Sequence, residues 1–423
     1  MREEEGRADK AVCVQSGRGR AADAALSLFL SSLPCASARA PGVAAPLLGD
    51  AIDARDDLAG LTLRRPHDRG CVVDWALARS LWARAFAAAL PGASTIPPGA
   101  RLVVTSPPLA PLQVLAATLD AAFGEFGFSA VAAVPSAELA ARAWAADEAA
   151  AAADAHRPPH DAAVAVAALV VDVGFSATTA AAVFDGRLIP STVARVDLGG
   201  KALTNVLKDA VSLRSIDVRG ETAAVAEMKD VASFVSLDLA SDLAAAKRGD
   251  FTLDWVLPDG LANARGFGRA RGPRAATAGN PLPDPPPPTA KETIVPLTLE
   301  RFMIPEALFH PADVGLAQGG VAEAAARALA AAHPRLRPLL ATNVLCVGAG
   351  AACPGFVARL QAELRPLVPD DFGLAVRAAA DPATAAWRGG ALLASSPDFW
   401  GRAVGRAEWE RGSVGGWAAA PRR

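Results

Sequence analysis

Residues 300–311 read Glu-Arg-Phe-Met-Ile-Pro-Glu-Ala-Leu-Phe-His-Pro, and they carry the clearest information on the fold. On physical grounds they predict the end of an extended segment followed by a short helix, which Pro305 is suited to open and Pro311 to close. Leu308 and Phe309 are the side chains that we expect to anchor this helix in a core. A turn of helix does not, however, explain why three charged residues, two phenylalanines and two prolines are spaced in this way.

The composition describes a chain with a substantial core and little net charge. The 423 residues suit one large domain or a few ordinary ones. Hydrophobic residues make up 52%, and the net charge of −2 gives no global field that attracts nucleic acid or an anionic membrane. The scattered cysteines and histidines argue against a disulfide framework and a zinc site. We expect a soluble protein without a secretory signal, because apolar runs are short and the start is polar.

The middle and late parts of the chain alternate strands, turns and helices. Residues 167–172 and 178–184 predict two strands of a hairpin, and a third strand leads to residues 197–201, which open a helix. Residues 343–364 predict a strand, a Gly-rich turn and a helix. This alternation is typical of an α/β protein with mixed sheets.

Other segments are predicted from periodicity and composition. A strand at 61–63, a helix carrying Trp75 and Trp82, a strand at 101–105 and a helix at 111–128 follow from the apolar pattern. Residues 145–162, rich in Ala, Asp, Pro and His, are expected to form a loop. Residues 263–292 join an Arg/Gly cluster to a proline run, which predicts a low-complexity insert that is disordered or partly polyproline II.

The pattern ERFxxPEALFxP in residues 300–311 resembles a signature of the actin superfamily. The resemblance implies an α/β, actin-like two-lobed fold, with duplicated ribonuclease H-like βββαβα halves around a nucleotide cleft. Residues 1–165 are then the first lobe, with a divergent N-terminus and a shortened filament-contact loop. Residues 166–355 are the second lobe with the insert at about 263–292, and residues 356–423 return to the first lobe.

In proteins of this kind, a hairpin from each lobe directs backbone N–H groups at the phosphates of ATP, and an Asp in each turn orients the hydrated metal. Asp172 and Gly174 match the second of these turns, although an Asp-x-Gly turn alone also describes an ordinary hairpin. When residues 11–19 are laid over the first turn, the metal-side Asp falls on Gln15 and the phosphate-contacting Lys on Ala22. A neutral amide cannot replace a carboxylate there, so we predict no metal site.

Two further segments resemble the adenosine side of the site. Gly348 and Gly350 match the Gly-rich turn that passes under adenosine, within the segment VLCVGAGAACPG at 344–355. Lys229 and Asp230 match a pair that lines the purine in actins, and a solvated pair on a helix surface describes them equally well. Together with Asp172 and Gly174, these are the predicted cofactor-binding residues.

Hydrolysis requires a water molecule that a polar group positions and deprotonates. By resemblance, the two positions that perform this task in actins fall on Ser136 and Thr179, and neither is a general base at neutral pH. We therefore predict no catalytic residues. ATP is expected to bind weakly or not at all, and not to be turned over.

Several segments resemble the nuclear actin-related proteins of SWR-type chromatin remodelling complexes. The resemblance implies a nuclear (in part also cytoplasmic), non-catalytic structural subunit of a complex that exchanges histone variants, without filament formation. The implied partners are a Swi2/Snf2-type ATPase, a small partner subunit and, indirectly, histones or nucleosomal DNA, with no membrane partner. The alternatives are a cytoplasmic cytoskeletal actin relative and an ATP-hydrolysing enzyme of the sugar kinase or chaperone type. The segments are residues 199–208, 229–238, 255–259, 362–371 and 381–390, and residues 72–75 and 103–105 also fit.

Overall fold

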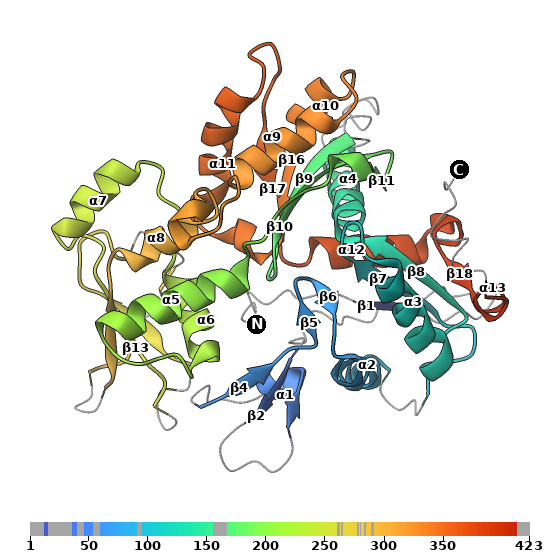
Figure 1. Ribbon diagram of the computed structural model, residues 1–423, viewed down its shortest axis with the longest axis horizontal. Coiled ribbons are helices and arrows are strands. Elements are labelled where there is room, and N and C mark those ends of the chain that lie inside the picture. Colours follow the sequence, from blue (N-terminus) through green and yellow to red (C-terminus); the bar gives the residue numbers. More distant parts are fainter. Residues whose placement is uncertain are drawn as a thin grey trace.

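The computed structural model describes residues 12–15, 36–39, 46–53, 60–90, 95–154, 167–259, 263, 265–276, 279, 281–282, 285–288 and 292–412. Two large sheets organise the molecule, and we call the parts built around them the first half and the second half (Figure 1). Each sheet mixes parallel with antiparallel strands and packs against helices. The α/β, actin-like fold class predicted from the sequence is therefore confirmed.

The first half is built on a four-stranded sheet in the order β1-β7-β8-β18. β7 and β8 run parallel, whereas β1 is antiparallel to β7 and β18 is antiparallel to β8. The chain therefore returns to this sheet near its end. The strands are β1 Val12–Gln15, β7 Arg101–Ser106, β8 Ala130–Pro135 and β18 Val404–Gly405.

Capping residues and the spacing of apolar side chains explain the helices of the first half, as α2, Trp75–Ala89, shows. Asp74 caps the helix that carries Trp75 and Trp82, because its carboxylate accepts the N–H of Leu77 at 3.1 Å. Phe86 of that helix lies 4.9 Å, centre to centre, from the Phe126 ring. The helical elements are α2 Trp75–Ala89, α3 Leu112–Asp120, the π-helical turn η1 Ala121–Glu125, α4 Ser136–Asp154, α12 Ala385–Ser395, η7 Pro397–Gly401 and α13 Arg406–Glu410.

The expected loop at residues 145–162 is wrong for its first part, because α4 continues to Asp154. Alanine dominates this stretch and has the highest helix propensity of all residues, so the acidic residues do not interrupt the helix. One of them, Asp147, pairs with Arg388 of α12 at 2.5 Å. Residues 155–162 lie outside the described part of the chain.

The second half is built on a six-stranded sheet, β11-β10-β9-β16-β17, with β12 paired to β10. β9 and β10 form the predicted antiparallel hairpin, and β16 runs parallel to both β9 and β17. The predicted hairpin is thus confirmed. The strands are β9 Ala167–Val173, β10 Thr178–Phe184, β11 Arg187–Leu188, β12 Ala194–Val196, β16 Val344–Val347 and β17 Val376–Ala378.

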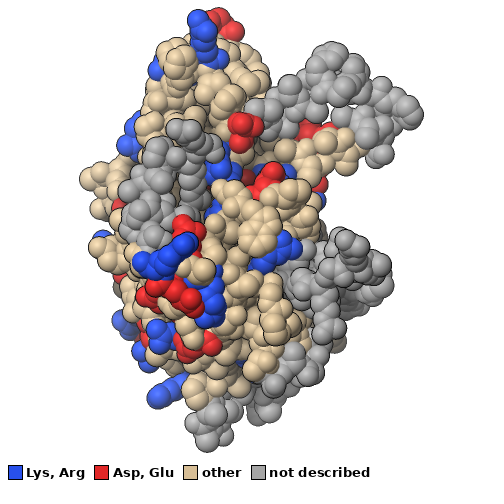
Figure 2. All heavy atoms as spheres, turned by 90° about the vertical axis from the view of Figure 1, so that its right-hand side faces the viewer, with Lys and Arg blue, Asp and Glu red and all other residues tan. Residues whose placement is uncertain are grey.

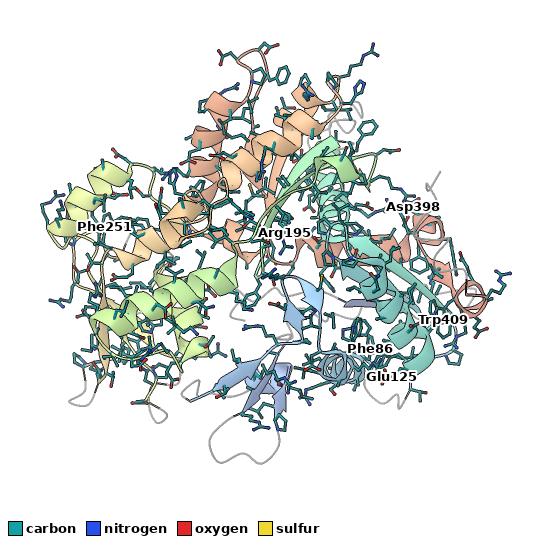
Figure 3. All side chains as sticks on the ribbon, in the orientation of Figure 1. Phe86, Glu125, Arg195, Phe251, Asp398 and Trp409 are labelled. Carbon is teal, nitrogen blue, oxygen red and sulfur yellow. The ribbon has the colours of Figure 1, made fainter. Side chains whose placement is uncertain are left out.

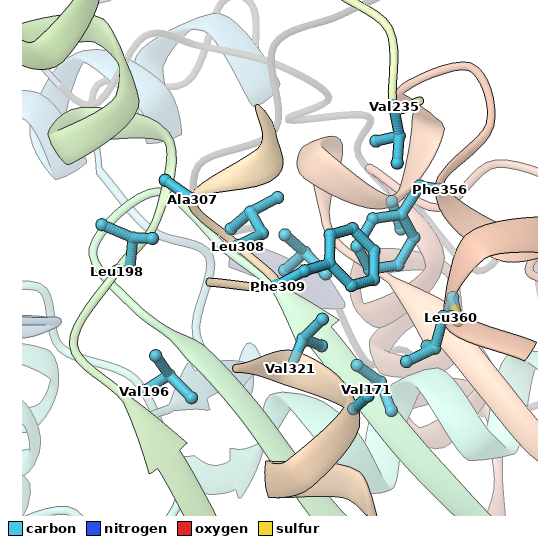
Figure 4. Packing of buried hydrophobic residues seen from close by; sticks show 14 of the residues in the cluster. Val171, Val196, Leu198, Val235, Ala307, Leu308, Phe309, Val321, Phe356 and Leu360 are labelled. Atoms are coloured by element: carbon cyan, nitrogen blue, oxygen red, sulfur yellow. The ribbon is translucent and has the colours of Figure 1, made fainter. Parts of the chain in front are cut away.

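Helices pack against this sheet around one large core, in which the Phe309 and Phe356 rings lie 5.6 Å apart (Figure 4). No helix within the described residues is both long and apolar enough to cross a membrane. The helical elements are η3 Pro190–Thr192, α5 Gly200–Arg214, α6 Thr222–Ala232, α7 Leu239–Lys247, α8 Glu300–Glu306, η4 Pro311–Val314, α9 Val321–Ala331, α10 Arg337–Ala341, η5 Ala349–Ala352, α11 Phe356–Leu364 and η6 Arg365–Leu367.

The motif at 300–311 forms α8 and the turn after it, with two differences from the prediction. Pro305 lies inside the last turn of α8 and does not open the helix, since the helix already begins at Glu300. Pro311 does not close α8, which ends at Glu306; it begins the next 3-10 turn, as a residue with a fixed φ can. Leu308 and Phe309 are buried core residues, as predicted.

The charged residues of the motif hold neighbouring segments together. Arg301 is only 1% exposed, and its guanidinium donates to the carbonyl oxygens of Ala232, Phe251 and Ala275 at 2.8–3.0 Å. Glu306 is fully buried and accepts two hydrogen bonds from Arg359 of α11. The spacing of the motif therefore serves packing, because each charge meets its partner inside the second half.

A third sheet, β14-β13-β15, corrects the prediction for the insert at 263–292. Residues expected to be disordered form β14 and pair with β13. Within the described residues of this region, Arg269 pairs with Glu292, and Arg271 lies 3.1 Å from Asp254. Acidic partners thus order this Arg-rich segment. The strands are β13 Leu253–Val256, β14 Phe267–Ala270 and β15 Ile294–Leu297.

Small elements of the first half extend toward the second half. We call residues 60–72 the arm, and in Figure 1 it lies, in blue, between the first-half sheet and helices α5 and α6. Its strand β4 belongs to a sheet in the order β3-β2-β4, and β5 and β6 form a hairpin. The elements are β2 Ser37–Arg39, β3 Leu47–Leu48, α1 Asp50–Asp53, β4 Thr62–Arg64, β5 His67–Asp68 and β6 Cys71–Val72.

Candidate functional site

The predicted phosphate turn, residues 172–177, joins β9 to β10. The two strands stay in register up to the pair Val173 and Thr178. Gly174 then closes the turn, since its N–H donates to the carbonyl oxygen of Ala177 at 3.1 Å. The turn is therefore tight and its backbone is fixed by the hairpin.

The first turn of α5 orients the peptide groups of the phosphate turn. The N–H of Gly200 donates to the carbonyl oxygen of Gly174 at 3.0 Å, and that of Lys201 to the carbonyl oxygen of Phe175 at 2.9 Å. In a planar trans peptide the N–H points opposite to the C=O, so the N–H groups of Phe175 and Ser176 are directed away from α5. Neither donates a backbone hydrogen bond within the part of the chain that is described. Two consecutive N–H groups of this kind form an anion-binding nest.

Asp172, at the end of β9, meets both residues predicted at the water-positioning sites. The hydroxyl of Ser136, the first residue of α4, donates to Asp172 Oδ2 at 3.0 Å. Thr179 lies directly opposite Asp172 in the β9–β10 ladder. The structure thus brings these three residues together. Hydroxyl groups can orient a water molecule, but they are poor acceptors of its proton at neutral pH.

The predicted adenosine turn lies against the phosphate turn. β16 is parallel to β9 and pairs Val347 with Asp172, so both turns follow the carboxyl ends of neighbouring strands. Gly348 has φ +83°, and a Cβ there would lie 2.7 Å from Asp172 Oδ1 and 2.5 Å from the Val173 carbonyl oxygen. A Cβ at Gly350 would overlap the Val173 side chain. Only glycine allows this close approach.

Lys229 and Asp230 lie in α6, beside the far end of the adenosine turn. They form an ion pair with each other, in which Lys229 is largely covered and Asp230 is half exposed. Burial raises the pKa of the Cys353 thiol to about 12, while the charge of Lys229 lowers it and that of Asp230 raises it. The pair therefore lies close enough to the turn to act on it electrostatically.

The arm contacts the second half beside this site, and these contacts were not predicted from the sequence. The N–H of Gly60 donates to Glu221 Oε2 at 3.0 Å, and Leu61 packs in a cluster with Ala223 of α6. Asp68 lies 3.5 Å from the Lys201 ammonium. No motif in residues 60–72 signals these contacts, since each joins residues more than a hundred positions apart.

Two arginines continue the contact between the halves. Arg195 of β12 donates to the carbonyl oxygen of Arg69 at 3.1 Å, and in Figure 3 it lies where the two halves meet. Arg195 also donates to Asp197 at 2.7 Å, which lowers the pKa of that carboxyl group. The guanidinium carbon of Arg65 lies 4.1 Å from the centre of the Phe175 ring. The arm thus reaches the phosphate turn itself.

The alignment of residues 11–19 with the first hairpin is not supported by the pairing of β1. In the second half the site lies at the carboxyl ends of parallel strands, as is usual for ligand sites in α/β sheets. β1 instead runs antiparallel to β7, and Gln15 pairs with Arg101 at the opposite, amino end of β7. Residues 16–19 and Ala22 lie outside the described residues.

The family model described as "Actin" matches residues 34–414. The chain belongs to the actin family. This actin-family protein is 35% identical over 400 residues to "Actin-related protein 6" of Oryza sativa subsp. indica, covering 89% of this chain and 90% of the relative. It is 36% identical over 374 residues to the protein of that name from Arabidopsis thaliana, covering 84% of each. The Drosophila melanogaster protein is 33% identical over 356 residues, covering 83% of this chain and 84% of the relative.

The residues of this actin-family protein suit a nucleotide phosphate better than a metal ion. The nest at Phe175 and Ser176 offers donors to phosphate oxygens, and the glycines at 348 and 350 allow the adenosine turn to pack directly against Asp172 and Val173. Asp172 is the one carboxylate that the resemblance places beside a hydrated magnesium. Among the described residues, no group of three or more His, Cys, Asp or Glu side chains is placed to hold a metal.

Proposed function

We propose that this actin-family protein is a non-catalytic structural subunit of a nuclear chromatin remodelling complex of the SWR type, which exchanges histone variants. The similarity to proteins named Actin-related protein 6, over 83–89% of this chain, carries the proposal. In this role the protein does not form filaments. Its partners are a Swi2/Snf2-type ATPase and a small partner subunit.

The phosphate turn supports a site that holds nucleotide weakly and does not hydrolyse it. ATP would be held by the N–H groups of Phe175 and Ser176, with Asp172 beside its magnesium. The bound nucleotide would supply polyphosphate charge that links the two halves. The residues that face Asp172 are the hydroxyls of Ser136 and Thr179, which lack a basic group for activating water.

Phosphate release from ATP tests the absence of turnover. Purified wild-type protein and Asp172→Ala are incubated with ATP and magnesium, and inorganic phosphate is measured against a buffer blank. We expect both proteins to match the blank. Release that depends on magnesium and disappears in Asp172→Ala would refute a non-catalytic site and favour the enzyme alternative.

The surface supports indirect contact with nucleosomal DNA. Figure 2 shows a face on which basic and acidic side chains are intermixed. Exposed ion pairs such as Arg79 with Glu125 and Arg406 with Glu410 also mix the two signs of charge on the surface. DNA-binding faces normally carry clustered positive charge that replaces counterions on the phosphates. Contacts to histones or DNA through neighbouring subunits agree better with this mixed charge.

Affinity purification of the tagged chain from nuclear extract tests the place in the complex. We expect a Swi2/Snf2-type ATPase and histone-exchange subunits to co-purify, and tagged conventional actin processed in parallel serves as the control. Enrichment of dynein-associated or filament-associated proteins would favour the cytoskeletal alternative. Recovery of the chain alone would contradict the scaffold role.

Sedimentation tests the absence of filaments. The purified chain is centrifuged at high speed after magnesium and ATP are added, beside conventional actin under the same conditions. We expect this chain to stay in the supernatant while actin pellets. A pellet that requires nucleotide would contradict the proposal.

A further inference from the structure

Arg65 brings a positive charge from the first half to the phosphate turn of the second half. It lies in the link between β4 and β5, and its side chain is half-buried. Its guanidinium stacks over Phe175, with 4.1 Å between the guanidinium carbon and the ring centre. Phe175 also supplies one of the two N–H groups that point away from α5. The charge and the nest therefore meet at the same residue.

A guanidinium beside two N–H donors is suited to a phosphate group. Arginine binds phosphate through two parallel hydrogen bonds, and the nest adds backbone donors from another direction. We propose that Arg65 is the phosphate-binding cation of this site, and that it recognises the terminal phosphates of a nucleoside polyphosphate from the half opposite the turn. The proposal refines the nucleotide part of the proposed function and is independent of the chromatin part.

The contacts of the arm explain how Arg65 is placed. Gly60 is held by Glu221, and the hairpin that follows Arg65 is held by Lys201 and by Arg195. These contacts are exposed or half-exposed, so each is weak by itself. A ligand that binds both Arg65 and the nest adds a further link between the halves. Phosphate binding and docking of the arm should therefore strengthen each other, as linkage requires.

The simpler alternative is that Arg65 only stacks on Phe175 and holds the arm in place. A cation–π contact at a half-exposed site contributes little, and it would not distinguish ligands with phosphates from those without. The two roles therefore differ in ligand dependence. ATP, ADP and adenosine share a base and a sugar but differ in their phosphates.

Calorimetric titration of the full chain with ATP, ADP and adenosine, in the presence of magnesium, separates the two roles. In Arg65→Gln we expect the affinity for ATP and ADP to fall about 10- to 100-fold, as for loss of a charged hydrogen-bonding group. Adenosine should bind equally to the variant and the wild type. Arg65→Lys should be intermediate, because it keeps the charge but loses the two-pronged geometry.

The neighbouring Arg64 provides a matched control. Its side chain is 75% exposed and pairs at 2.7 Å with Asp74, the capping residue of α2. Arg64→Gln should bind all three ligands like the wild type. Hydrogen exchange gives a second readout: ATP should slow exchange in residues 60–72 of the wild type and of Arg64→Gln, but not of Arg65→Gln.

Three results would overturn the proposal. The first is equal ATP affinity in Arg65→Gln and Arg64→Gln. The second is an equal loss of affinity for ATP and for adenosine in Arg65→Gln. The third is no binding of ATP to the wild type at millimolar concentration. Circular dichroism and the melting temperature without ligand establish that each variant is folded. The proposed scaffold role would survive all three results, since co-purification of remodelling subunits tests it separately.

Discussion

Replacing Arg301 by methionine should destabilise the second half more than any exposed arginine replacement. The Arg301 guanidinium joins the end of α6, the segment before β13 and the segment after β14, through the carbonyl oxygens of Ala232, Phe251 and Ala275. All four residues are buried. Methionine has a similar length but no donors, so the variant leaves three carbonyl groups without this partner.

The expected loss in the free energy of unfolding of Arg301→Met is the balance of two opposing effects. Each buried carbonyl group left without a partner costs about 1–3 kcal/mol, which gives about 6 kcal/mol for three. Burial lowers the pKa of Arg301 to about 10. Since one pKa unit corresponds to about 1.4 kcal/mol, the wild type already carries a desolvation cost of about 3 kcal/mol for this charge. Methionine removes that cost, so the expected net loss is about 3 kcal/mol in the free energy of unfolding.

Urea unfolding followed by circular dichroism measures this loss. Arg219→Met is the control, because Arg219 and its partner Asp217 are both well exposed, and it should unfold at nearly the same urea concentration as the wild type. Arg301→Lys should lie between the two variants, since it keeps the charge without the planar arrangement of donors. If Arg301→Met and Arg219→Met unfold at the same urea concentration, the assignment of Arg301 as a hub of buried hydrogen bonds is wrong.

Three further changes test other parts of the structure. Arg359→Met should lower the free energy of unfolding by about 3–5 kcal/mol, because it removes the arginine that pairs with the fully buried Glu306 carboxylate. Glu306→Gln should lower it less, and equal losses in urea unfolding would contradict this asymmetry. Gly389→Ala should lower the melting temperature strongly, because its methyl group would overlap the Leu139 carbonyl oxygen where α12 crosses α4. Gly401→Ala is the control and should not lower it, because a methyl group at that position meets open space. Arg195 lowers the folded-state pKa of Asp197, so this carboxylate stabilises the protein above its unfolded pKa of about 3.9, and the effect is lost as the pH falls through the lower folded value. The difference in melting temperature between the wild type and Asp197→Asn should therefore be constant from pH 8 to pH 5 and shrink below about pH 4, and a difference that shrinks above pH 5 would refute this.

The parts of the fold predicted correctly are those that local sequence determines. The β9–β10 hairpin follows from two apolar runs around a Gly-containing turn, and α2 follows from the cap at Asp74 and its apolar spacing. The motif at 300–311 predicted the fold class through its resemblance to an actin signature, and in the structure Arg301 and Glu306 of the motif each have a defined partner. Those partners themselves could not be predicted, since Arg301 and Ala232 lie 69 positions apart.

The errors arose where distant residues decide the local structure. β14 looked like a disordered Arg/Gly segment, but β13 supplies its pairing and Glu292 neutralises Arg269. The end of α4 looked like a loop, because polar residues among alanines do not reveal the ion pair that Asp147 makes with Arg388.

The candidate site was predicted in its residue types more than in its geometry. Resemblance suggested Asp172, Ser136 and Gly348. The structure brings Asp172 and Gly348 to the carboxyl ends of the neighbouring strands β9 and β16, and Ser136 of α4 donates a hydrogen bond to Asp172. It did not suggest Arg65, because an arginine in a short polar link has no periodicity or motif to mark it. Its position beside Phe175 exists only once the arm has folded against the second half.

The return of the chain to the first sheet has a consequence for synthesis on the ribosome. Glu138 of α4 pairs with Arg402, which follows it by 264 positions, and β18 completes the sheet beside β8. At about 5–20 residues per second, α4 emerges about 13–50 s before that partner. The second half, continuous from β9 to β17, can fold during this interval. One edge of strand β8 in the first-half sheet remains unpaired until β18 has been made. Nascent-chain chaperones should therefore associate with the first half, and release it only when the last strand has been made.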